Sequence, residues 1–274
     1  MTSPLDPSNP PQSVGRSDDV KHLFSQQGLQ ALDTVMRLQP LLAFDFDGTL
    51  APIVTLPDDA RVSIGVAQRL EQLARRLPVA IVTGRSVADV APRLGFEPHF
   101  IIGNHGAEDP DSPQLSQEVY GALTQQLNQL RERIAERQPL LTAAGVLVED
   151  KLHSLTLHYR LARDRDQAMR AIDNALGELD PALRQFGGKC VVNIVAAHAP
   201  DKGDAVAALV HRTGAQAALF IGDDVNDESV FERAQPSWLT VRIGRDDPMS
   251  KARYFLDTHA EVATMLQQMV TSLP

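Results

Sequence analysis

The sequence predicts an α/β protein whose core is a Rossmann-like, doubly wound parallel sheet. Two apolar runs, 41–44 and 79–82, have the length of buried strands and are bounded by turn residues. Helical spacing follows each of them: Ser63 opens a helix that Pro78 stops, and Ser86 opens the next helix. Strands that alternate with helices in this way are typical of a parallel sheet with crossover helices.

The rest of the core is predicted on the same grounds. We expect a helix over 20–38 interrupted by Gly28, short strands at 100–102, 217–221 and 238–243, and a C-terminal helix after Glu261. Residues 1–18 contain four prolines among serines and aspartates and have almost nothing to bury. We therefore expect a disordered N-terminal tail.

The pattern changes after a linker-like stretch at 109–113. A helical stretch at 115–138, strand-like runs at 146–149 and 152–159, a helix at 164–179 and a strand at 189–195 follow. The second run alternates: Leu155, Leu157 and Tyr159 share one face, and Ser154, Thr156, His158 and Arg160 share the other. This predicts an antiparallel sheet. Spacing alone favours a polar face that simply meets water.

Carboxylates cluster where two of the predicted strands end. Asp45 and Asp47 follow strand 41–44 two positions apart, so an extended backbone projects both to the same side. A second cluster, 222–228 with the sequence GDDVNDE, follows strand 217–221. A lone DxDG is often an ordinary turn, but Asp45 lies inside an apolar run, where an ionised carboxylate is unfavourable unless a metal or partner compensates. Two acidic strand ends therefore favour an oxygen-ligand site for Mg²⁺.

Two further polar residues lie at helix starts, where a phosphoryl group can bind. Thr83 stands between strand 79–82 and a helix, so its hydroxyl and the nearby N–H groups can hold a phosphoryl oxygen. The alternative is that Thr83 only caps the turn, and position alone does not separate the two. Lys202 lies in a first helical turn, where the helix dipole disfavours a cation unless an anion lies nearby. As a single surface lysine it would be unremarkable.

Composition excludes several classes of function. With 274 residues, 43% hydrophobic and 22% charged, the chain resembles an ordinary globular protein. A formal net charge of −9 argues against a nucleic-acid partner, and the one cysteine, Cys190, excludes an internal disulfide. The sequence shows neither an apolar run of the roughly 18 residues that a membrane span needs nor the apolar core of a signal peptide. We expect a cytoplasmic monomer without a membrane partner.

Taken together, the motifs resemble a known superfamily. DFDGTL, Thr83, Lys202 and GDDVND, in this order over roughly 41–243, are similar to the haloacid dehalogenase superfamily of aspartate-nucleophile phosphatases. Within it, DFDGTLAPI, GNHGAE, HYR, GKCVV and GDDVNDE most resemble the trehalose-6-phosphate phosphatases. The resemblance implies a catalytic core at 19–112 and 197–274, with a smaller α/β cap domain inserted at 113–196. It also implies that the polar face of the cap sheet closes over a small sugar phosphate.

The resemblance further implies a role for each candidate residue. Asp45 would attack phosphorus, and Asp47 would act as general acid and then as general base. Thr83 and Lys202 would hold the phosphoryl group. Mg²⁺ would be bound by Asp45, the backbone carbonyl of Asp47 and Asp223. Asp227 would either bind Mg²⁺ through water or orient Lys202. Asp224 stays open between the metal site and a structural turn. The substrate-facing residues would be Arg85, Asn104, His105, Glu108, Lys151, Ser154, His158, Lys189 and Asn193.

Four positions depart from the trehalose-phosphatase pattern. Asn193 stands where a Glu is usual, Val195 and Ala196 replace a basic residue and Pro, and Asn226 replaces the more usual Thr. An Asn can hydrogen-bond sugar hydroxyls, but it does not accept from them as a carboxylate does. A phosphatase for sucrose phosphate or mannosylglycerate phosphate is therefore the alternative. A silent phosphosugar-binding protein is a third hypothesis, and the complete set of catalytic positions disfavours it.

Overall fold

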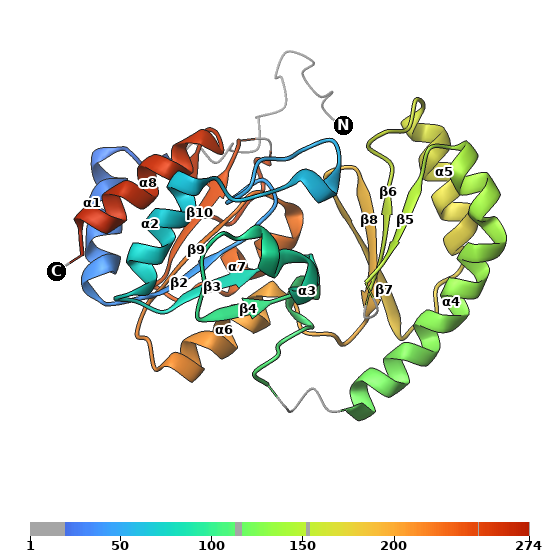
Figure 1. Ribbon diagram of the computed structural model, residues 1–274, viewed down its shortest axis with the longest axis horizontal. Coiled ribbons are helices and arrows are strands. Elements are labelled where there is room, and N and C mark those ends of the chain that lie inside the picture. Colours follow the sequence, from blue (N-terminus) through green and yellow to red (C-terminus); the bar gives the residue numbers. More distant parts are fainter. Residues whose placement is uncertain (1–19, 113–116, 152–153, 246, 274) are drawn as a thin grey trace, which may run out of the picture.

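The computed structural model describes residues 20–112, 117–151, 154–245 and 247–273, which form two sheets with helices packed on them (Figure 1). The larger sheet is parallel throughout and has the order β1-β11-β10-β9-β2-β3-β4. Its strands are β1 Lys21–His22, β2 Leu41–Phe44, β3 Val79–Val82, β4 Phe100–Ile102, β9 Ala218–Gly222, β10 Leu239–Ile243 and β11 Tyr254–Leu256. From β2 the chain runs outward to β4 and later returns to β9, so the strand order reverses between β2 and β9. In open α/β sheets, ligands bind at such a switch point.

Helices cover both faces of this sheet, as a doubly wound fold requires. They are α1 Gln26–Arg37, α2 Ile64–Ala74, α3 Val87–Val90, α6 Lys202–Thr213, α7 Glu228–Arg233 and α8 Ala260–Thr271. Leu42, Phe44 and Leu219 face α1, α2 and α8 in one buried cluster, while Leu41, Ala43 and Phe220 face α6 and α7 in another. Ser63 and Ser86 cap α2 and α3 through their side chains, so the predicted helix starts are confirmed.

The smaller sheet is antiparallel, with the order β5-β6-β8-β7, and the chain enters it between β4 and α6. Its elements are α4 Gln117–Ala143, β5 Leu147–Asp150, β6 Leu155–His158, α5 Arg165–Leu176, β7 Leu183–Gly188 and β8 Val191–Ala196. We call this unit the cap and the remainder the core. Leu155, Leu157 and Ile194 pack under α4 and α5, so the apolar face points outward to the helices and the polar face points toward the core (Figure 1). The domain limits at 113 and 196 stay a prediction.

The central part of the polar face of the cap sheet is shielded from water, so the expectation drawn from spacing alone is wrong. Ser154, Thr156 and Asn193 are at most 2% exposed. Their burial follows from the core that lies against this face, and alternation within one strand carries no information about such a partner. A cavity described below lies between the two units.

Several predicted boundaries shift for physical reasons. The first helix begins at Gln26 instead of residue 20, because Lys21 and His22 pair with β11 as a short strand. β7 and β11 were not predicted: β7 ends in two glycines, and β11 has only three residues. The disordered tail at 1–18, the start of the helix at 115 and the start of the strand at 152 lie outside the described residues.

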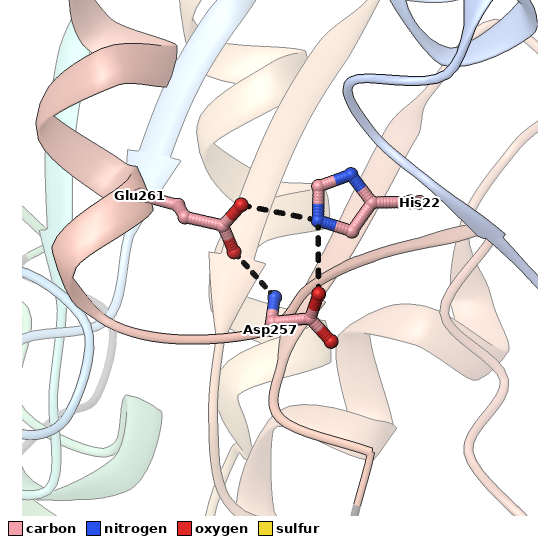
Figure 2. A group of neighbouring side chains, drawn as sticks. All are labelled: His22, Asp257 and Glu261. Carbon is pink, nitrogen blue, oxygen red and sulfur yellow. Dashed lines mark hydrogen bonds and ion pairs between the residues drawn. The ribbon is translucent and has the colours of Figure 1, made fainter.

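His22 fastens β1 to the start of α8 (Figure 2). Its Nδ1 accepts a hydrogen bond from the Phe24 N–H at 3.1 Å, so Nε2 carries the proton. That Nε2 lies 3.2 Å from Glu261 and 3.5 Å from Asp257. The three side chains are close enough to hold a metal ion, but a ring nitrogen that carries a proton is not a metal ligand. The group therefore connects β1 to the start of α8.

None of the described helices has the length and hydrophobicity to cross a membrane.

Candidate active site

A cavity of about 230 Å³ lies between the carboxyl ends of the core strands and the polar face of the cap sheet. Both units supply polar groups to it. The core contributes Asp45, Asp47, Arg85, His105, Asp223, Asp224 and Asn226, and the cap contributes Glu149, Lys151, Thr156, His158, Arg160, Lys189 and Asn193. A concave site with convergent polar groups at a switch point is the expected place for a small ligand.

Three buried carboxylates meet at the core end of the cavity. Asp45 follows β2, and Asp223 and Asp227 follow β9; they offer oxygens that lie within 4.8 Å of one another. Gly48, at φ +77°, allows this approach, because a Cβ there would lie 2.0 Å from the Asp223 carboxylate. Asp227 Oδ2 accepts hydrogen bonds from the N–H groups of Asp223 and Asp224, both at 2.9 Å. Asp223 Oδ1, in contrast, is buried and has no hydrogen-bond partner among the residues that the structure describes.

Lys202 provides a buried positive charge in this cluster. Its Nζ donates to Asp45 Oδ1 and to Asp227 Oδ1, both at 2.7 Å, and the side chain is 1% exposed. Burial alone would lower the pKa of Lys202, but the two carboxylates outweigh it and raise the pKa. These carboxylates are the nearby anions that a lysine in a first helical turn requires.

Negative charge still exceeds positive charge in the cluster. Burial raises the pKa of Asp45 well above its usual range, and the like charges of Asp227 and Asp223 add to this effect. Lys202 opposes it but does not cancel it. Burial likewise raises the pKa of Asp223 to about 6, although Lys189 from the cap donates to its Oδ2 at 2.5 Å. Three carboxylates face two ammonium groups. The residues therefore fit a hard cation, which prefers oxygen ligands and would satisfy Asp223 Oδ1.

This excess of charge predicts a pH dependence of stability in metal-free protein. The raised pKa of Asp223 means that the folded protein keeps a proton that the unfolded chain loses near its ordinary value of 3.8. The resulting stability is present below that value and is lost as pH rises through about 6. Replacing Asp223 by Asn should remove this effect. The free energy of unfolding of the variant, relative to that of the wild type, should therefore rise by about 2 kcal/mol from acid to neutral pH. Thermal denaturation in chelator across pH measures this difference, and a difference that stays constant would contradict it.

Asp47 and Arg85 form a pair at the wall of the cavity, beside the cluster. Arg85 Nε donates to Asp47 Oδ2 at 2.7 Å, and Nη2 donates to Oδ1 at 2.8 Å. The carboxyl group of Asp47 is thus turned toward Arg85 and does not belong to the three-carboxylate cluster. This leaves only the backbone of Asp47 for the metal role that the resemblance implies.

Thr83 makes the turn-capping contact that the sequence left open. Its Oγ1 accepts the Arg85 N–H at 3.2 Å, and its carbonyl accepts the His105 N–H at 2.9 Å. The side chain is 1% exposed and does not line the cavity. Its contact with a phosphoryl group stays a prediction.

The loop after β4 gives one residue to the cavity and uses others as a brace. Asn104 Nδ2 donates to Glu108 at 2.7 Å, Glu108 also accepts the Val87 N–H at 3.0 Å, and Ser154 donates to Asn104 Oδ1 at 2.8 Å. Asn104, Glu108 and Ser154 are not among the described residues that line the cavity, and their contact with substrate stays a prediction. Their polar atoms bind one another and fix the cap to the core. His105 does line the cavity.

His105 is held neutral in this wall. Burial is the main reason that its pKa lies well below the usual range, and the charges of Lys151 and Lys202 add to it. Its Nδ1 lies 3.3 Å from Asn226 Nδ2, so it accepts there. His105 is therefore a hydrogen-bonding group at neutral pH and not a cation.

The cap contributes a set of polar groups that reach across to the core. Lys151 donates to the Gly84 carbonyl at 3.1 Å, and burial lowers its pKa. His158 lies 2.7 Å from Glu149. In the predicted set, Lys151, His158, Lys189 and Asn193 all line the cavity.

Sequence reasoning did not select Glu149 or Arg160 as site residues. Glu149 is opposite Thr156 in the register of β5 and β6, and β5 was too short for a readable alternation. The alternation of the strand-like run puts Arg160 on the polar face, and this position is the signal that could have identified it as a site residue. It donates to the Val54 carbonyl at 3.2 Å and to the Lys189 carbonyl at 3.1 Å, and so joins the core segment at 54 to the cap.

Known proteins share both the sequence and this architecture. Trehalose-phosphate phosphatases of Mycobacterium marinum and Mycobacterium avium are 33% and 34% identical to this chain, over 89% and 85% of its length. The chain covers 66% and 63% of them, just under two thirds of their length. Among solved structures, the C-terminal domain of Candida albicans trehalose-6-phosphate phosphatase aligns with a TM-score of 0.75 at 21% identity, over 93% of this chain and 99% of that one. The Aspergillus fumigatus trehalose-6-phosphate phosphatase aligns with a TM-score of 0.59 at 24% identity, over 92% and 99%.

These structural likenesses establish the fold, with a parallel-sheet core and a cap. The family follows from sequence. The sequence model described as trehalose-phosphatase matches residues 43–260, which reach from within β2 to the first residue of α8. Since this range takes in the cap sheet, most of the core sheet and the cavity between them, the chain belongs to the trehalose-phosphatase family.

Proposed function

We propose that the chain hydrolyses trehalose 6-phosphate to trehalose and phosphate, with Mg²⁺ as cofactor and Asp45 as nucleophile. One observation carries the proposal. The buried carboxylate of Asp45 lies 2.7 Å from the Lys202 ammonium, inside a carboxylate cluster that opens into the cavity between core and cap. A phosphate monoester dianion repels nucleophiles, so a nucleophile held beside fixed positive charge is what its hydrolysis needs.

The reaction then proceeds in two displacements. Asp45 attacks phosphorus, the bond to the sugar oxygen breaks, and an aspartyl-phosphate forms while Asp47 gives the departing oxygen a proton. Asp47 next takes a proton from water, which attacks the same phosphorus and releases phosphate. Lys202 favours the charged form of Asp45 for the first step, because its ammonium donates to Asp45 Oδ1 at 2.7 Å and opposes the burial that raises the pKa of this carboxyl group.

The metal would be held by Asp45, Asp223 and Asp227. When bound, Mg²⁺ supplies positive charge against the transferring phosphoryl group. Its fit rests on the unpartnered Asp223 Oδ1 and on the excess of buried carboxylates described above. Asp224 caps the turn before α7, since its Oδ1 accepts the Val225 N–H at 2.9 Å, so we assign it a structural role.

The sugar would lie against the polar face of the cap. Lys151, His158 and Asn193 line the cavity there, and a site that hydrogen-bonds particular hydroxyls can discriminate strongly between sugars. Asn193 is occupied in part, since its Oδ1 accepts the Thr156 hydroxyl at 2.9 Å, which leaves its amide N–H groups for a sugar oxygen. A monomeric state and a cytoplasmic location stay predictions.

A side-by-side panel of sugar phosphates tests the substrate. We expect kcat/KM for trehalose 6-phosphate to exceed that for sucrose 6-phosphate and glucose 6-phosphate by at least about tenfold, which corresponds to roughly 1.4 kcal/mol of differential transition-state binding. Equal kcat/KM values would be compatible with the mechanism but would overturn the assignment of trehalose 6-phosphate as the substrate. Binding of these sugars without turnover of any would indicate the silent binding protein.

A further inference from the structure

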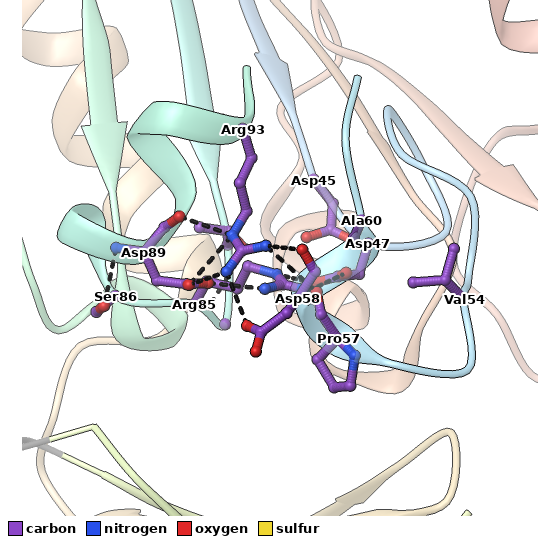
Figure 3. A network of polar contacts seen from close by, with 12 residues as sticks. Asp45, Asp47, Val54, Pro57, Asp58, Ala60, Arg85, Ser86, Asp89 and Arg93 are labelled. Atoms are coloured by element: carbon purple, nitrogen blue, oxygen red, sulfur yellow. Dashed lines mark hydrogen bonds and ion pairs between the residues drawn. The ribbon is translucent and has the colours of Figure 1, made fainter. Parts of the chain in front are cut away.

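A row of alternating charges leads away from Asp47 through Arg85 and Asp89 to Arg93 (Figure 3). Arg85 binds both oxygens of Asp47 and donates through Nη1 to Asp89 Oδ2 at 2.7 Å. Arg93 donates to the other oxygen of Asp89, through Nε at 3.1 Å and through Nη2. Asp89 lies in α3, Arg93 ends the 3₁₀ turn that follows it, and Arg85 stands just before Ser86, the residue that caps α3. The one carboxylate of Asp89 is thus divided between two arginines, with one oxygen for each.

The far end of the row is fastened to another segment of the core. Arg93 Nη1 donates to the Asp58 carbonyl at 2.6 Å, and Arg85 Nη2 donates to the Pro57 carbonyl at 2.8 Å. Pro57–Asp59 is a short 3₁₀ helix, and the cavity wall includes Pro57. Asp47 and Arg85 line the cavity, whereas Asp89 and Arg93 do not. Arg93 nevertheless is only 8% exposed, so its contacts are fixed by packing.

Asp89 is one of the groups that hold the Arg85 guanidinium, together with Asp47 and the Pro57 carbonyl. Burial would raise the pKa of Asp89, but hydrogen bonds from Arg93 and Arg85 lower it overall, so the group is an anion at neutral pH. If Arg93 were absent, both oxygens of Asp89 would be available to Arg85, and the guanidinium would be drawn away from Asp47. The Asp47 side chain is 44% exposed, and Arg85 supplies the contacts that orient it. Its direction therefore depends on a residue that lies outside the cavity.

We propose that Asp89 and Arg93 are positioning residues for Asp47, an assignment that rests on the proposed function. A general acid must lie within hydrogen-bond reach of the leaving oxygen, and a displacement of about 1 Å can cost two orders of magnitude in rate. Arg93 acts through Asp89 and Arg85, without touching substrate. Its role is specific to the proton transfer and leaves phosphoryl binding at Lys202 and the carboxylate cluster unaffected.

The test is the dependence of kcat/KM on the leaving group. In a series of aryl phosphates, good leaving groups depart without a proton, whereas poor ones need the general acid. Arg93→Met should therefore lose about tenfold or more on the poorest leaving group, with little loss on the best, so that log kcat/KM falls more steeply with leaving-group pKa. Arg93→Lys should recover part of the loss. The matched control is Arg75→Met, which removes an exposed arginine paired with Glu71 on α2 and should keep the wild-type slope.

A purely structural role would lower kcat/KM for all substrates by the same factor. Such a uniform loss, or an unchanged slope of log kcat/KM against leaving-group pKa, would overturn the proposal. If Arg93→Met does not fold, Asp89→Asn decides in its place, because the amide keeps the shape but presents a donor to one arginine. It should steepen the slope in the same way, and an unchanged slope would again overturn the proposal. Failure of the wild type to hydrolyse any phosphate ester would instead refute the proposed function, so the two failures are distinguishable.

Discussion

Replacement of Asp45 by Asn should abolish turnover of every phosphate monoester while leaving the protein folded. An amide has nearly the shape of the carboxylate but is not a nucleophile, so we expect kcat to fall by at least about a thousandfold. Folding should survive, because Asn keeps an oxygen for the Lys202 ammonium, 2.7 Å away, and removes one of three buried like charges. Initial rates and thermal denaturation of the same preparation measure both effects.

Asp33→Asn is the matched control for this variant. Asp33 lies on the exposed side of α1, where it pairs with Arg37, so its replacement should leave kcat unchanged. Retention of the wild-type rate by Asp45→Asn would exclude Asp45 as nucleophile. A large loss accompanied by unfolding would mean that the carboxylate serves the structure first.

Removal of divalent metal should stop turnover, and added Mg²⁺ should restore it. Without the metal, the phosphoryl dianion would face the carboxylates of Asp45, Asp223 and Asp227, with Lys202 and Lys189 as the nearby cations. We expect a loss of at least about a hundredfold, a magnitude that the removal of one strong electrostatic contact to the transition state supplies. Dialysis against a chelator, followed by assay with increasing Mg²⁺, measures the loss and the recovery.

The variant Asp223→Asn refines this test. It removes a predicted ligand, so it should require more Mg²⁺ than the wild type to reach half of its own maximal rate. Full activity of the wild type after exhaustive dialysis against chelator would show that the carboxylate cluster is not a metal site for catalysis. An unchanged Mg²⁺ requirement in the variant would remove Asp223 from the ligand set.

The core and its charged cluster could be predicted because their signals are local. A buried strand followed by carboxylates is readable in 41–47, and the same pattern recurs at 217–223. Parallel strands place their carboxyl ends on one edge, so the meeting of Asp45 with Asp223 follows from the fold class. The burial of Lys202 against Asp45 likewise agrees with the helix-dipole argument.

The fate of individual polar side chains could not be predicted, because it depends on partners distant in the sequence. Asn104 and Ser154 are 50 positions apart, and each satisfies the other in place of a ligand. Asp47 turns toward Arg85, 38 positions away, and not toward the carboxylates beside it. A polar residue in a loop or on a strand face has the same local signal whether it braces two units or faces a cavity.

The most direct test of the central claim is to trap the phosphorylated protein during turnover. Trehalose 6-phosphate carrying labelled phosphate is mixed with the protein and Mg²⁺, the reaction is stopped rapidly in acid, and the label is located by peptide mapping. The account predicts covalent phosphate on the peptide that contains Asp45, formed and lost at rates that match turnover, and absent from the Asp45→Asn variant. Steady release of phosphate with no label on the protein, or with the label on another residue, would contradict it.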